Sequence, residues 1–231
     1  MNVLAMDTCF GALSVAAGGG RGGVHVLLAE AHETGKTGGA ERLMPMIREV
    51  MQASGLAFPD LDRLAVTVGP GTFTGVRTGI AAVRGLALAT GKPVVTMTSL
   101  SVMAACARGI LPEAERVLCV AVDARQKAVY VQVFGADGQA GPPALLSTKH
   151  AAGLIGRERV LVVGSAAAAV AAAVEAAGGS ADVRLLDLQP HARALALAAP
   201  SLAPVDRIAP LYLRAPDVKQ QRDGTRLWAK F

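Results

Sequence analysis

The glycines and threonines of segment 66–81, VTVGPGTFTGVRTGIA, are residue types that bind phosphate in other proteins. A β-branched run ends at 69–71 (Gly-Pro-Gly) and an apolar, glycine-containing segment follows, which predicts a strand, a tight turn and a helix. Neither turn glycine is followed by Gly-Lys at Walker A spacing, and Thr74 stands where a GxGxxG motif needs glycine. Backbone N–H groups at the helix start can still accept an anion. Our candidate phosphate contacts are Asp7, Thr8, Gly71 and Thr72.

Two aspartates, Asp7 and Asp123, end the predicted strands 2–7 and 116–123. A carboxylate at a strand end can bind metal or handle phosphate, and it can also simply begin a turn, which is the commoner role. Both interpretations remain open for both residues.

Other chemistry-bearing residues are scattered. The four histidines form no HxxxH or HxxE pair, the three cysteines form no CxxC pair, and no GxSxG motif occurs. We therefore predict no catalytic residue, no metal site, no disulfide and no cofactor bound by this chain alone.

The elements that must position these residues follow one order twice. The first half predicts strands at 2–7, 12–17, 24–30, 62–69 and 93–97, with helices at 40–54 and 74–90. After a helix at 99–108, the second half predicts strands at 116–123, 128–134 and 159–164. VLAMDT pairs with CVAVDA, and RLAVTVG with RVLVVG, which indicates an internal duplication.

The predicted fold is therefore α/β, with two tandem βββαβαβ lobes at 1–100 and 101–231. This plan is that of the actin, sugar-kinase and heat-shock ATPase superfamily, in which ligands bind between the lobes. Fold alone does not fix a function.

The two long helices of the first half have unusual surfaces. Apolar residues of 40–54 extend beyond one stripe and include three of the seven methionines, while 74–90 carries small residues at helical spacing. Close packing on the protein's own sheet and docking of a second chain both explain such faces. The candidate partner contacts are Leu43, Met44, Met46, Val50 and Met51 on the first helix and Gly75, Thr78, Gly79 and Ala82 on the second. On this hypothesis Gly79→Arg or Val50→Glu abolishes pairing and leaves the subunit folded.

Charge and hydropathy bear on the possible partners of the protein and on its location in the cell. Lys and Arg number 23 against 18 Asp and Glu, a net charge of +5 that permits a nucleic-acid partner without requiring one. Residues 214–231 carry five basic and two acidic side chains, which form either a solvated tail or a phosphate-contacting one. We predict no signal peptide and no membrane span, and expect a cytoplasmic protein.

The segment 68–95, VGPGTFTGVRTGIAAVRGLALATGKPVV, closely resembles the TsaB (YeaZ) family. Supporting matches occur in order along the chain: MDT at 6–8, AERLMPMI at 40–47, VDARQKAVY at 122–130 and PLYLR at 210–214. The resemblance implies a non-catalytic subunit of the machinery that makes threonylcarbamoyladenosine in tRNA. It also implies that helices 40–54 and 74–90 bind the catalytic paralogue TsaD, with the ATPase TsaE and tRNA as further partners.

The paralogue carries an HxxxH metal pair where Ala40 and Met44 stand here, so the resemblance gives this chain no metal chemistry of its own. Whether ATP binds at the interface with the partner is left open. A homodimer is expected in isolation, because exposed apolar faces associate. The alternative function is an independent small-molecule kinase or glycoprotease-type peptidase.

Overall fold

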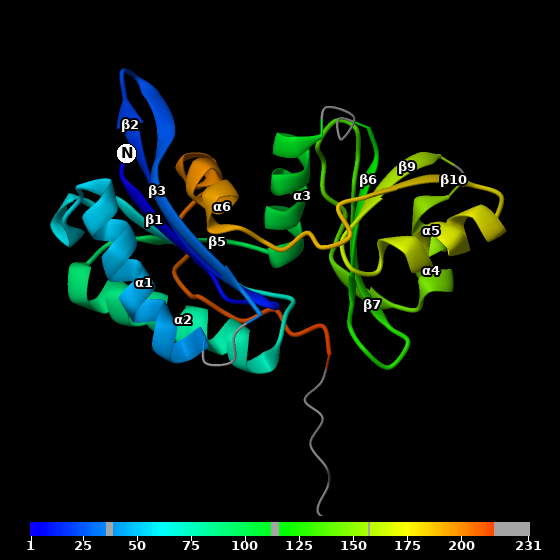
Figure 1. Ribbon diagram of the computed structural model, residues 1–231, viewed down its shortest axis with the longest axis horizontal. Helices are drawn as coiled ribbons and strands as arrows, with labels where there is room; N and C mark the ends of the chain where they lie inside the picture. Colours follow the sequence, from blue (N-terminus) through cyan, green and yellow to red (C-terminus); the bar gives the residue numbers. More distant parts are fainter. Residues whose placement is uncertain (36–38, 112–115, 157, 215–231) are drawn as a thin grey trace, which may run out of the picture.

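A computed structural model describes residues 1–35, 39–111, 116–156 and 158–214, which form two five-stranded sheets with helices packed against them (Figure 1). The predicted α/β class is confirmed. Each sheet is built by one βββαβαβ unit, as the sequence indicated.

The first sheet contains β1 (Val3–Asp7), β2 (Ala12–Arg21), β3 (Val24–Thr34), β4 (Arg63–Thr67) and β5 (Val94–Met97), in the order β3-β2-β1-β4-β5. The first three strands form an antiparallel meander, and β4 and β5 extend it in parallel. Helix α1 (Gly39–Ser54) and the 3₁₀ turn η1 (Phe58–Asp60) connect β3 to β4, and α2 (Phe73–Thr90) connects β4 to β5. Pro45 lies inside α1 and does not end it.

The second sheet repeats this design. Its elements are β6 (Leu118–Asp123), β7 (Val129–Phe134), β8 (Ala144–Leu146), α4 (Thr148–Ile155), β9 (Arg159–Val163), α5 (Ala167–Ala176) and β10 (Ser180–Arg184). Their order, β8-β7-β6-β9-β10, and the mixture of antiparallel and parallel pairs match the first sheet. The shared topology extends the short sequence repeats to whole units.

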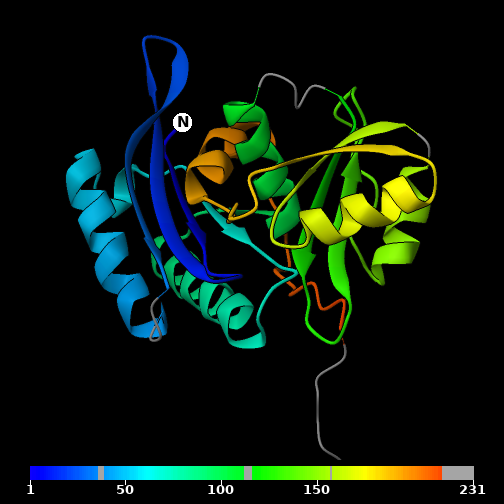
Figure 2. The same ribbon diagram turned by 45° about the vertical axis from the view of Figure 1, so that its right-hand side comes forward.

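The two faces of the first sheet have different covers, because successive strand residues point to opposite sides. Leu4 and Met6 of β1 face α1 and α2. Val3 and Ala5 face the opposite side, where α3 (Ser99–Ile110) and α6 (Ala192–Ala198) pack. Figures 1 and 2 both show α3 and α6 between the two sheets.

The end of the described chain returns to the first sheet, within the range 101–231 that the sequence analysis assigned to the second lobe. After β10, α6 and the 3₁₀ turn η3 (Ala199–Ser201) cover the Val3/Ala5 face. Arg63 of β4 donates to the carbonyls of Ala199 and Leu202, at 3.1 and 2.6 Å. The sheet face is apolar and must be covered, and the C-terminal helix provides that cover.

The described helices include none with the length and hydropathy needed to cross a bilayer.

Candidate functional site

The strand-end corner brings the four phosphate candidates together. Asp7 and Thr8 follow β1, and Gly71 and Thr72 lead into α2. The Thr72 N–H donates to the Cys9 carbonyl at 2.7 Å, and the Thr72 hydroxyl caps α2 by accepting from the Gly75 N–H at 3.1 Å. The Thr8 hydroxyl donates to the Gly75 carbonyl at 2.6 Å. These polar groups therefore already bind one another and hold the corner.

Asp7 is inaccessible to a ligand. Its side chain is fully buried, and the Thr67 hydroxyl donates to its Oδ1 at 2.5 Å. No described residue is hydrogen-bonded to its Oδ2. Burial raises the pKa of Asp7 to about 7, and bonds from Thr67 and Cys9 oppose this rise. The carboxyl is part of the core beneath the corner, which contradicts a phosphate-contacting role.

Asp123, the other strand-end aspartate, is exposed, and its Oδ1 accepts from the Arg125 N–H at 2.9 Å. It begins the turn between β6 and β7. No group of three His, Cys, Asp or Glu side chains suited to a metal occurs among the described residues.

The glycines of the corner and of α2 permit close packing within the chain. A Cβ at Gly71 would clash with the Cys9 carbonyl oxygen, and one at Gly75 would clash with the Thr8 carbonyl oxygen. A Cβ at Gly79 would lie 2.7 Å from the Thr8 hydroxyl. Of the two interpretations left open by the sequence, the structure therefore supports packing on the protein's own sheet for Gly75 and Gly79.

Most predicted contacts on α1 also face inward. Leu43, Met46, Val50 and Met51 are buried in the core cluster that contains Leu4 and Met6. The wide apolar stripe of α1 is filled by the sheet and by α2, so these four side chains are not a free surface. Charged substitution at Val50, or arginine at Gly79, would disrupt folding and cannot serve as a clean test of pairing.

The solvent side of the two helices offers a different set of residues. Met44 is 44% exposed, Leu88 is 90% exposed, and Thr78 and Ala82 are half-buried. A Cβ at Gly85 would meet nothing within 4 Å, so this glycine faces open space. The α1–α2 outer face is defined here as Met44, Arg48, Thr78, Ala81, Ala82, Gly85, Leu88 and Ala89.

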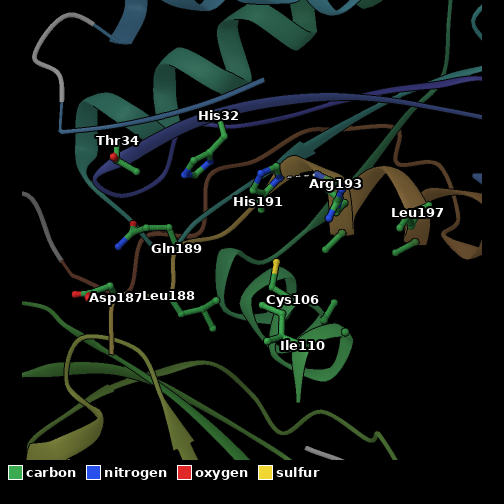
Figure 3. Close-up of a pocket in the computed structure, with 14 residues that line it drawn as sticks. His32, Thr34, Cys106, Ile110, Asp187, Leu188, Gln189, His191, Arg193 and Leu197 are labelled. Atoms are coloured by element: carbon green, nitrogen blue, oxygen red, sulfur yellow. Dashed lines mark hydrogen bonds between the residues drawn. The ribbon is translucent and has the colours of Figure 1, made fainter. Parts of the chain in front are cut away.

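A second feature, which the sequence did not predict, is a cavity of about 640 Å³ on the opposite side of the first sheet. Its walls come from β3, α3, the segment after β10, and α6. In Figure 3 the rings of His32 and His191 lie near one another, and the Cys106 sulfur points toward His191. The hydrophobic periodicity of the sequence does not predict this cavity, because the segments that line it are distant in sequence and meet only in the folded chain.

Burial and the neighbouring His32 lower the pKa of His191, while Glu30 opposes the effect. The rings of His32 and His191 stack with centroids 4.6 Å apart. Burial also raises the pKa of Cys106. Both pKa shifts favour the uncharged forms, the neutral His191 imidazole and the protonated Cys106 thiol.

Comparison with known structures supports the two-lobed fold. YeaZ from Pseudomonas aeruginosa superposes with a TM-score of 0.72 at 27% identity, covering 92% of this chain and 99% of that chain. A chain of the PilM–PilN type IV pilus biogenesis complex superposes with a TM-score of 0.51 at 10% identity, covering 88% and 99%, which shows the fold alone. The fold of the chain is therefore the fold of YeaZ, in two α/β units.

Sequence comparison gives the family. A family model described as TsaD, tRNA N6-adenosine threonylcarbamoyltransferase, matches residues 33–184, which is more than half of the chain. The chain therefore belongs to the group of proteins that this model describes. The tRNA threonylcarbamoyladenosine biosynthesis protein TsaB of Escherichia coli (strain K12) is 38% identical over 133 residues, 56% of this chain and 53% of that protein. The TsaB of Haemophilus influenzae is 38% identical over 132 residues, covering 56% and 52%. Within the group, the chain belongs to the TsaB (YeaZ) family. It spans about half the length of these curated relatives in the matched regions.

Proposed function

We propose that the protein is a non-catalytic subunit of tRNA threonylcarbamoyladenosine biosynthesis that binds a TsaD-type catalytic paralogue through the α1–α2 outer face. Its TsaB relatives carry the name of that biosynthesis, and the TsaD family model matches 33–184. The proposal also includes a TsaE-type ATPase and tRNA as partners in the complex, ATP at the junction with the paralogue, and a homodimer in isolation.

The α1–α2 outer face is the observation that carries this proposal. Leu88 is 90% exposed near the end of α2, and Gly85 and Ala81 precede it at helical spacing. Small residues allow a partner backbone to approach closely, and an exposed leucine supplies apolar area to bury. The face therefore suits a helical partner that packs along α2 and meets Met44 of α1.

The roles of the corner residues support a non-catalytic subunit. The hydroxyls of Thr8 and Thr72 bond the backbone, and Asp7 lies in the core. These groups stabilise the junction of β1 with α2, so binding energy at the outer face is the contribution that the proposal assigns to this chain.

Leu88→Glu and Gly85→Arg test the interface without disturbing the core. We expect both variants to remain folded and to lose complex formation with the TsaD-type protein of the same organism, because each places a charge or bulk on the outer face. Size-exclusion chromatography with light scattering measures the complex, and circular dichroism checks the fold.

The matched control is Leu154→Glu, since Leu154 is 57% exposed on α4 of the second unit. It should form the complex normally. An unchanged complex with Leu88→Glu and Gly85→Arg would disprove docking at this face.

A further inference from the structure

The segment Tyr212–Arg214 joins the start of α2 to the turn between β6 and β7. The Arg77 Nε donates to the Tyr212 hydroxyl at 2.8 Å. The Arg214 guanidinium donates to Gln126 Oε1 at 2.6 Å and to the Arg125 carbonyl at 3.2 Å. Arg77, Arg125, Lys127 and Arg214, called the basic strip below, thus gather along a surface shared by both units.

The positive charge of the basic strip is not compensated within the described part of the chain. No described carboxylate forms an ion pair with any of its four cations, although Asp123 accepts from the Arg125 backbone. Elsewhere the pattern differs: Arg42 pairs with Glu33 and Glu49, and Arg159 pairs with Asp182. Unpaired cations gathered on one surface attract a polyanion.

Two exposed aromatic rings lie at one end of the basic strip. Phe73 is 45% exposed and Tyr212 is 39% exposed, and their centroids are 5.5 Å apart. The Arg77 guanidinium lies 3.5 Å from the Phe73 ring centroid. The chain has only eight Phe, Trp and Tyr residues, so two exposed side by side next to cations are unusual here. Exposed aromatic and guanidinium planes stack unpaired bases.

The β6–β7 turn holds its cations outward. Arg125, Gln126 and Lys127 have φ values of 61°, 52° and 61°, a left-handed run of three non-glycine residues. All three side chains are exposed. Arg214 contacts this turn through two bonds and adds a third positive charge beside it. The exposed cations of the turn are therefore available to phosphate oxygens.

We propose that the basic strip binds a single-stranded loop of RNA, with phosphates on Arg125, Lys127 and Arg214 and an unstacked base on the exposed ring of Tyr212, which Phe73 supports from behind. This rests on the proposed function, which supplies tRNA as the RNA. Acidic protein is the less suitable partner, because it offers no planar bases to stack on the exposed rings. The sequence after 214 adds four basic and two acidic residues.

The test measures binding of a labelled tRNA anticodon stem-loop by fluorescence anisotropy at several salt concentrations, with the full chain alone and in complex with the TsaD-type protein. For the double variant Arg125→Gln/Lys127→Gln we expect about tenfold weaker binding. Its plot of log affinity against log salt should be shallower by about 1.4, since each phosphate contact on a single strand contributes about 0.7. Tyr212→Ala should weaken binding by about tenfold and leave the salt slope unchanged, because it removes stacking rather than charge.

The matched control is Arg159→Gln/Arg193→Gln, which removes two cations that the structure pairs with Asp182 and Glu30. Its RNA affinity should equal that of the wild type. Equal weakening by this control, or unchanged affinity in the basic-strip variant, overturns the proposal. Competition by polyglutamate as strong as that by unlabelled RNA also overturns it.

The same samples separate this proposal from the proposed function. If the basic-strip variant forms the complex normally and loses RNA affinity, both stand. If it loses the complex and keeps RNA affinity, the strip is a protein interface and the RNA proposal fails. If Leu88→Glu keeps the complex, the docking proposal fails, while RNA affinity still reports on the strip.

Discussion

At the scale of single residues, Asp7 shows how position decides chemistry. A strand-end aspartate beside a glycine turn is the pattern of a phosphate or metal ligand, and the sequence could not distinguish that from a buried turn residue. The difference lies in Thr67 and Cys9, which surround the carboxyl only after β1 and β4 pair. Long-range packing therefore decided what local sequence left open.

Asp7 should make the protein less stable as pH rises. Its pKa is raised from 3.8 to about 7 in the folded chain, so the unfolded chain releases this proton first. The contribution of Asp7 to the free energy of unfolding is then fully present below about pH 4 and is lost as the pH rises to about 7. Across this window we expect the free energy of unfolding of Asp7→Asn, relative to that of the wild type, to rise by a few kcal/mol. Urea unfolding of both proteins between these limits measures the difference, and parallel pH profiles would refute the prediction.

Two glycines of α2 should respond oppositely to alanine. Gly75→Ala places a Cβ against the Thr8 carbonyl oxygen, so it should destabilise the protein by about 1–3 kcal/mol. Gly85→Ala meets nothing within 4 Å and should stabilise it by about 1 kcal/mol through helix propensity. Chemical denaturation of the isolated chain tests the pair. Equal shifts would show that Gly75 does not mediate the close approach to β1.

At the scale of elements, sequence periodicity located α1 and α2 within one residue, and it placed core-facing residues beside exposed ones such as Met44 among the candidate contacts. The stripe through Leu43, Met46 and Val50 is the one that the core buries, since apolar periodicity reports burial against the nearest sheet first. On α2 the outer face contains the small residues Ala81, Ala82 and Gly85 at helical spacing, and that spacing fitted packing on the sheet as well as docking of a partner. A helix can be predicted from its own residues, whereas the face it leaves for a partner is known only once the elements that pack against it are known.

At the scale of the whole molecule, the duplication could be inferred from the matched strands of the two halves, whereas β8, α4 and β10 of the second unit were not predicted as elements. The return of α6 to the first sheet could not be predicted. The α6 sequence, ARALALA, is short and alanine-rich, and nothing in it names the sheet it covers. The cavity and the basic strip escaped prediction for the same reason, since each joins segments that are distant in sequence.

Leu195→Ala tests this return. Leu195 is buried among Val3, Ala5 and Ala65, so the change should destabilise the protein by about 2–5 kcal/mol. Native-state hydrogen exchange should show protection lost in β1 and β4 rather than in β6 and β9. Protection lost in the second sheet alone would mean that α6 belongs with the second unit in solution.

The chain passes from the first sheet to the second after α3 and comes back after β10, so two peptide connections join the halves. A protease that cuts one connection therefore leaves the halves covalently joined by the other, and α3 contributes buried residues to clusters on both sheets. The segment 211–214 adds a further contact between the halves, because the Leu211 N–H donates to the Val68 carbonyl and Arg214 donates to the β6–β7 turn.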